Sequence, residues 1–115
     1  MPGDLTAARA AAWTALVLLL LGQVYLLYVV AGTGSPPFPH ADKVGHMALF
    51  AVPALVAAVL RSRWAVGLIA VHAVVAEPLQ GLFTTTRVTD PWDAVANVSG
   101  LLLGLAGALV MGGRR

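Results

Sequence analysis

The chain has 115 residues, of which 59% are hydrophobic and only 10% are charged, and its formal net charge at pH 7 is +2. Soluble proteins are about half apolar and about a quarter charged, so this composition excludes an ordinary water-soluble domain. The basic residues are scattered rather than contiguous, which argues against nucleic-acid binding, and the absence of cysteine excludes disulfides and thiolate metal sites.

Four apolar stretches follow one another along the chain, each near the roughly 20 residues that cross the hydrocarbon of a bilayer. They predict transmembrane helices over residues 10–31, 44–60, 64–83 and 94–111. The first stretch ends like a signal peptide, but its apolar run is longer than the roughly 7–15 residues of a signal core, so we interpret it as a span. We therefore expect one all-α domain over residues 1–115, an integral membrane four-helix bundle.

Proline and charged residues mark the breaks in these stretches. Pro53 and Pro78 lie inside spans and predict kinks, because neighbouring helices in a bundle can satisfy the carbonyls that proline leaves free. Residues 61–63 predict a tight hairpin. Before the fourth span, Asp90 is a suitable N-cap and Pro91 a suitable first helical residue.

The arginines indicate how the bundle is oriented, because cytoplasmic loops retain an excess of Lys and Arg. With four spans, both termini lie on the same side as the hairpin at residues 61–63. That side collects five basic residues: Arg9, Arg61, Arg63, Arg114 and Arg115. We therefore predict a multi-pass protein of the bacterial cytoplasmic membrane, with both termini in the cytoplasm.

The polar residues within or beside the spans gather at one depth, near the opposite side. By helical rise, Glu77 and Asn97 share roughly one layer near the outer ends of their helices. The candidate binding residues at this level are Asp42, Lys43, His46, Glu77, Gln80, Arg87, Asp93 and Asn97. Gly100 and Gly104 follow on the Asn97 face in a GxxxG spacing, which favours close helix packing and also allows an oligomer.

The order and spacing of these residues resemble the VanZ-like family. The resemblance covers roughly residues 42–104 and consists of Asp42-Lys43-x-x-His46, Glu77-x-x-Gln80, Arg87, and then Asp93, Asn97, Gly100 and Gly104. Pro78 directly after the glutamate and the compact loop containing Arg87 depart from the family pattern. The resemblance implies a membrane protein of the cell envelope and, for the family's namesake, antibiotic resistance through lowered susceptibility to teicoplanin, a glycopeptide with a lipid chain.

Glu77 is the strongest candidate for a functional residue, because a carboxylate in hydrocarbon costs several kcal/mol unless it is paired, protonated or wet. Two interpretations remain open: it pairs with Lys43, Arg87 or His46 and locks the bundle, or it also handles a ligand. Gln80 and Asn97 more often join helices by hydrogen bonds. His72, near mid-membrane, is expected to be packed or partnered, and Trp13, Trp64 and Trp92 to anchor the span ends.

The favoured function is a non-enzymatic envelope protein whose outward-facing polar pocket binds or excludes a lipid-linked headgroup or lipopeptide, with Lys43 and Arg87 meeting phosphate or carboxylate. The alternatives are a membrane-embedded hydrolase or transferase acting on lipid headgroups, with His46 or Glu77 as general base, and a small transporter subunit. No nucleophile motif supports an enzyme.

His46 with Asp42, Glu77 and Asp93 supplies nitrogen and oxygen donors of the kind that hold a divalent metal. A single histidine without a second at ligand spacing is more often a hydrogen-bonded bundle residue, so the favoured interpretation has no metal site and no cofactor. Membrane lipids are the expected partners.

Overall fold

A computed structural model describes residues 2–30, 40–83 and 91–113 of the chain. Within these ranges every element is a helix, and four helices are long and apolar enough to cross a membrane. The elements are α1 (Pro2–Tyr25), its π-helical continuation η1 (Leu26–Val30), α2 (Ala41–Val59), α3 (Arg63–Phe83) and α4 (Pro91–Gly113). The prediction of an all-α membrane-spanning four-helix bundle is confirmed.

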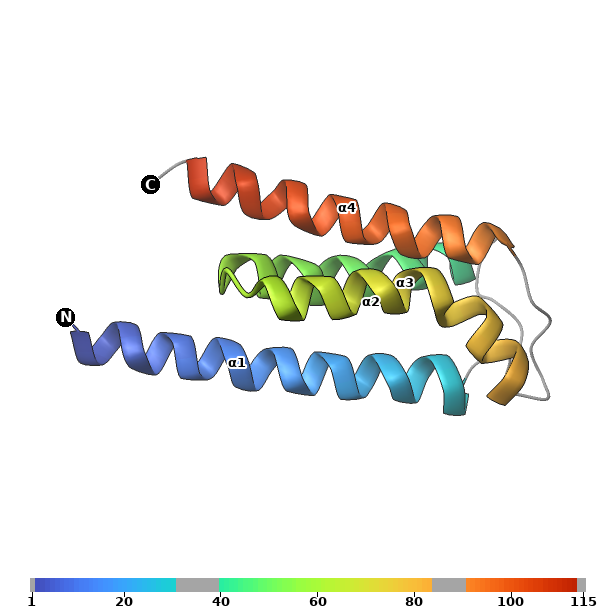
Figure 1. Cartoon of the computed structure of the whole chain (residues 1–115), viewed down its shortest axis with the longest axis horizontal. Coiled ribbons are helices and arrows are strands. Elements are labelled where there is room, and N and C mark those ends of the chain that lie inside the picture. Colours follow the sequence, from blue (N-terminus) through green and yellow to red (C-terminus); the bar gives the residue numbers. More distant parts are fainter. Residues whose placement is uncertain (1, 31–39, 84–90, 114–115) are drawn as a thin grey trace.

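Helix α2 is the centre of the bundle. It contacts α1, α3 and α4, whereas α1 and α4 lie on opposite sides of the α2–α3 pair (Figure 1). The start of α1, the α2–α3 connection and the end of α4 share one end of the molecule. At the other end, the start of α2 lies near the end of α3 and the start of α4, so the polar termini of three helices meet there.

Two glycines on α4 allow it to approach the backbone of α2. A Cβ at Gly100 would lie 2.8 Å from the Cα of Met47 and closer still to its carbonyl oxygen. A Cβ at Gly104 would lie 3.0 Å from the Cβ of Ala54 and would collide with the Ala51 carbonyl. Small residues at helix interfaces permit this close contact in membranes, where packing rather than water exclusion holds helices together.

A Schellman motif ends α2 and forms the tight turn into α3. The Arg61 N–H donates to the Ala58 carbonyl at 3.0 Å, and the Ser62 N–H donates to the Ala57 carbonyl at 3.1 Å. Arg61 has a φ of 58°, in the left-handed region where glycine is usual. The Ser62 hydroxyl then accepts a 3.2 Å hydrogen bond from the Ala65 N–H and caps α3. The predicted hairpin is therefore confirmed.

Both prolines lie within helices, as predicted. Pro53 has no N–H for the Leu49 carbonyl one turn before it. That carbonyl instead accepts a 2.8 Å hydrogen bond from Gln23 Nε2 of α1, so a neighbouring helix satisfies it. Near Pro78 the last turns of α3 bend toward the end of α1 and η1 (Figure 1).

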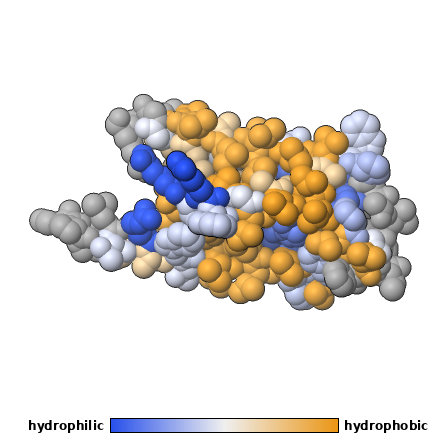
Figure 2. All heavy atoms as spheres, in the orientation of Figure 1, coloured by the Kyte–Doolittle hydropathy of each residue, from blue (hydrophilic) through white to orange (hydrophobic). Residues whose placement is uncertain are grey.

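The surface between the two ends is mainly apolar. Figure 2 shows hydrophobic atoms over most of the length of the bundle, with strongly hydrophilic atoms gathered toward the end that carries the α2–α3 turn. Large exposed hydrophobic side chains occur on every helix, among them Leu21, Leu68 and Leu109. Trp64 is 86% exposed and Trp92 is 69% exposed near the starts of their helices, positions that suit the headgroup layer. This surface indicates a multi-pass membrane protein.

Candidate functional site

Buried polar side chains from three helices meet at the end of the bundle opposite the α2–α3 turn. The first two turns of α2 supply one of them, the first two turns of α4 supply two, and the last two turns of α3 supply two. The buried members are His46, Glu77, Gln80, Asp93 and Asn97, none of them more than 5% exposed. Such groups are expensive to remove from water, so their contacts decide what the site can do.

Lys43 forms the main ion pairs of the site. Its Nζ lies 2.7 Å from Asp93 Oδ1 on α4 and 2.7 Å from Asp42 Oδ2 on its own helix. The Asp93 side chain is fully buried, whereas that of Asp42 is 40% exposed. The lysine therefore neutralises a carboxylate that water does not reach, and it ties the start of α2 to the start of α4.

Asn97 fixes the orientation of the His46 ring. Asn97 Nδ2 donates to the Ala73 carbonyl of α3 at 3.3 Å, which directs its Oδ1 toward His46. Because that oxygen only accepts, His46 Nδ1–H is the donor of the 2.7 Å hydrogen bond between them. The second ring nitrogen, Nε2, then faces Asp93 Oδ2 at 3.6 Å.

Glu77 lies beside this pair. It is 3% exposed, so its side chain faces the interior of the bundle. One carboxylate oxygen of Glu77, one of Asp93 and one ring nitrogen of His46 lie within 4.8 Å of one another. Tyr28 of η1 is close enough to interact electrostatically with Glu77. The cluster thus brings together five predicted site residues on three helices: Lys43, His46, Glu77, Asp93 and Asn97.

The structure gives Gln80 a different position. Its Nε2 donates a 2.8 Å hydrogen bond to the Leu27 carbonyl in η1. Gln80 therefore joins α3 to the first helix by a hydrogen bond, in agreement with the role expected from the sequence. Arg87 and the expected N-cap Asp90 lie outside the described residues, whereas α4 begins at Pro91 as predicted.

A second polar network, nearer the middle of the bundle, was not predicted from the sequence. The Tyr28 hydroxyl and His72 Nε2 are 2.6 Å apart, and His72 Nδ1 lies 2.8 Å from Gln23 Oε1. Because Gln23 Nε2 donates to the Leu49 carbonyl, its Oε1 accepts from His72 Nδ1–H, and the tyrosine donates to Nε2. His72 is partnered, as expected. The sequence feature that identifies Gln23 as a candidate is its polar amide inside an otherwise apolar span.

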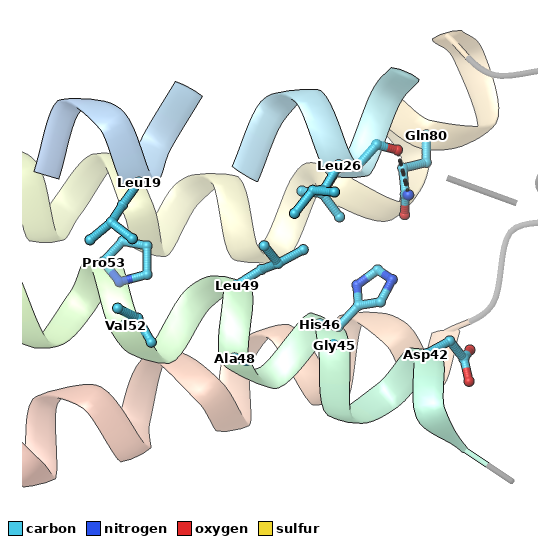
Figure 3. A pocket seen from close by; sticks show the side chains of 11 residues that line it. Leu19, Leu26, Asp42, Gly45, His46, Ala48, Leu49, Val52, Pro53 and Gln80 are labelled. Atoms are coloured by element: carbon cyan, nitrogen blue, oxygen red, sulfur yellow. Dashed lines mark hydrogen bonds between the residues drawn. The ribbon is translucent and has the colours of Figure 1, made fainter. Parts of the chain in front are cut away.

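An apolar groove of about 510 Å³ runs beside the polar cluster, between α2 and the first helix. Leu19, Val52 and Pro53 line its deep part, whereas Asp42, His46 and Gln80 line the end near the helix termini (Figure 3). His46 thus belongs to both features, since its ring nitrogens engage the buried cluster and its side chain borders the groove.

Comparison of the chain with models of known protein families, with curated proteins and with solved structures finds no match. The resemblance to the VanZ-like family therefore remains a prediction that depends on the spacing of the residues described above.

Proposed function

We propose that this chain is a VanZ-like protein of the bacterial cytoplasmic membrane that binds one lipid-linked molecule in the outer leaflet. The hydrocarbon chain lies in the groove beside α2, and the headgroup lies at the polar end near Asp42. The observation that carries the proposal is the form of the groove, which is apolar along its length and polar only where the helices end.

The depth of the groove matches one leaflet. From Asp42 to Pro53 the helix advances about 16 Å, roughly half of the 30 Å hydrocarbon core. In a bilayer this groove opens sideways to lipid rather than to water. A hydrocarbon chain fits there without desolvating any polar group, because only the upper end offers hydrogen-bonding side chains.

The charges of the site favour particular headgroups. Lys43, which the sequence suggests as an anion contact, is already engaged by Asp42 and Asp93. The partly exposed carboxylate of Asp42 is a strong acceptor, so it suits a headgroup with hydroxyl or amine donors, such as a sugar or an amino sugar. A lipoglycopeptide such as teicoplanin, which the VanZ-like resemblance implies, has both a lipid chain and such donors.

Binding is favoured over catalysis by burial. Glu77 and Asp93 are 3% and 0% exposed, so neither reaches a headgroup in the groove as a general base must. The hydrolase or transferase alternative has His46 or Glu77 as general base. His46 borders the groove, but its ring nitrogens are turned to the buried cluster, Nδ1 to Asn97 and Nε2 to Asp93. The alternative of a transporter subunit would need an oligomer that encloses a pathway.

The orientation of the proposed site follows from charge. Arg9, Arg61 and Arg63 belong to the end of the bundle that carries the α2–α3 turn. If that end is cytoplasmic, as the positive-inside rule requires, the groove mouth and the polar cluster face the outer leaflet.

The proposal is tested by photocrosslinking in nanodiscs with a phospholipid that carries a diazirine in its acyl chain. We expect labelled peptides to come from the walls of the groove. Ala48 is an exposed residue that lines it, and Ala48→Trp should reduce this labelling by about fivefold or more, which corresponds to roughly 1 kcal/mol of binding.

Ala106→Trp is the matched control, because Ala106 is also exposed but lies on α4. Labelling spread evenly over all exposed faces, or unaffected by Ala48→Trp, would contradict the proposal. Competition by teicoplanin, compared with a glycopeptide that lacks a lipid chain, then distinguishes a lipopeptide ligand from a bulk phospholipid.

A further inference from the structure

We propose that His46, Glu77 and Asp93 form a binding site for a divalent transition-metal ion, with Zn²⁺ as the ion to be tested. The three residues come from α2, α3 and α4, and each is at most 5% exposed. Each offers one ligand atom, and the three atoms lie within 4.8 Å of one another. Nitrogen and carboxylate donors together suit Zn²⁺ or Mn²⁺ better than soft ions such as Cu⁺.

The orientation of the histidine is an independent argument for this site. Histidines that bind metals usually donate the N–H of the other ring nitrogen to an oxygen, which fixes the tautomer and the ring direction. His46 has this arrangement, because Nδ1–H donates to Asn97 Oδ1 and the amide of Asn97 is itself fixed by the Ala73 carbonyl. Nε2, which carries the lone pair in this tautomer, then faces Asp93 Oδ2 at 3.6 Å.

The distances permit coordination with small side-chain movements. For bonds of about 2.1 Å, the ligand atoms of a tetrahedral Zn²⁺ site are roughly 3.4 Å apart. His46 Nε2 and Asp93 Oδ2 are 3.6 Å apart, close to that value. Asp93 presents its other oxygen to Lys43, so both contacts can exist at once. Because the third ligand comes from a different helix, the bound ion would tie α2, α3 and α4 together.

The sequence offers His46, Asp42, Glu77 and Asp93 as donors for a divalent metal but favours a site without one, since the chain has no second histidine at ligand spacing from His46. The tertiary structure supplies the other ligands from helices that are distant in sequence. A metal-free cluster is the competing arrangement, in which Lys43 and a doubly protonated His46 balance the charges of Glu77 and Asp93. The two arrangements differ in one measurable property, the saturable binding of an ion.

The experiment uses the full chain in nanodiscs, stripped with EDTA and titrated with Zn²⁺ alone. We expect one Zn²⁺ per chain and a higher resistance to unfolding when it is bound. Loss of an outer-shell partner usually weakens metal binding by about 10–100-fold, which is the effect expected for Asn97→Ala. Glu77→Gln and Asp93→Asn remove a ligand and should weaken binding further.

His40→Ala is the matched control, because His40 is exposed and lies outside the cluster. It should bind Zn²⁺ like the original chain. If a ligand variant does not fold, X-ray absorption of the Zn²⁺-loaded original chain decides the question, since the site requires one imidazole and otherwise oxygen ligands. Absence of saturable binding, a spectrum without imidazole, or unchanged binding in folded Glu77→Gln would overturn the proposal. Glu77 and Asp93 do not line the groove, so Zn²⁺ binding and its loss in their variants are measured separately from lipid labelling of the groove.

Discussion

Gln23 of α1 donates a 2.8 Å hydrogen bond to the Leu49 carbonyl of α2. That carbonyl has no intrahelical donor, because the residue one turn later is Pro53. The amide that lies inside the first span and the proline that lies inside the second are therefore two parts of one contact. His72 completes it by donating to the Gln23 carbonyl oxygen.

This contact predicts that substitutions at Gln23 and Pro53 have coupled effects on stability. Gln23→Leu should destabilise the protein by about 1–3 kcal/mol, because it leaves the Leu49 carbonyl unsatisfied in a setting without water. In a Pro53→Ala background the same change should cost less, since the alanine would supply the missing N–H. A double-mutant cycle of reversible SDS unfolding in mixed micelles measures the coupling. Equal costs in both backgrounds would show that the proline is irrelevant to Gln23.

The glycines of α4 predict a steric effect. Gly100→Ala places a methyl group against the Met47 backbone, which cannot move aside as a flexible side chain can. We expect a loss of about 1–3 kcal/mol in the free energy of unfolding.

Gly67→Ala is the control for this change. Gly67 also lies within a helix, but a Cβ there meets nothing within 4 Å. Alanine should raise stability slightly at that position, because it is the better helix former. Similar effects of the two changes would mean that α2 and α4 do not pack through Gly100.

The two ion pairs of Lys43, with Asp93 and with Asp42, should contribute unequally to stability. Lys43→Met leaves the fully buried Asp93 without its cation and should cost about 3–5 kcal/mol. Asp42→Asn removes a partner that is 40% exposed, and such pairs contribute at most about 1 kcal/mol. Lys43→Met combined with Asp93→Asn should recover much of the loss, as measured by the same unfolding assay. A small effect of Lys43→Met alone would indicate that water reaches Asp93.

The turn between α2 and α3 offers a stabilising change. Arg61 adopts a left-handed conformation that disfavours residues with a side chain by about 1–2 kcal/mol. Arg61→Gly should therefore raise the unfolding free energy by roughly 1 kcal/mol. Arg61→Lys keeps both the charge and the conformational strain, so it should give no gain. If lysine stabilises as much as glycine, the strain is not the cause.

The orientation of the bundle can be measured directly because the chain contains no cysteine. We expect a cysteine at Ser62 to react with an impermeant maleimide only from the cytoplasmic side, and one at His40 only from the outside. In intact cells only the cysteine at residue 40 should be labelled, whereas in lysed cells both cysteines should be labelled. The reverse pattern would place the groove mouth in the inner leaflet and contradict the proposed site.

The sequence by itself determined that the chain lies in a lipid bilayer, where its helices are, and at what depth its polar residues lie. Transfer of an apolar segment into hydrocarbon is a local property of about 20 residues, so composition and length identify four spans without knowledge of their neighbours. Helical rise likewise places Glu77 and Asn97 in one layer, because it depends only on residue number.

Only the tertiary structure decided which polar groups meet. The order of helices around α2 depends on the sum of many packing contacts, such as Gly100 against Met47, and no single segment contains that information. For this reason the sequence suggests an external anion or Glu77 as the partner of Lys43, whereas the structure pairs Lys43 with Asp93. The sequence likewise does not identify Gln23 as the residue that satisfies the Leu49 carbonyl. Local sequence sets the depth of each polar side chain, whereas helix packing selects its partner.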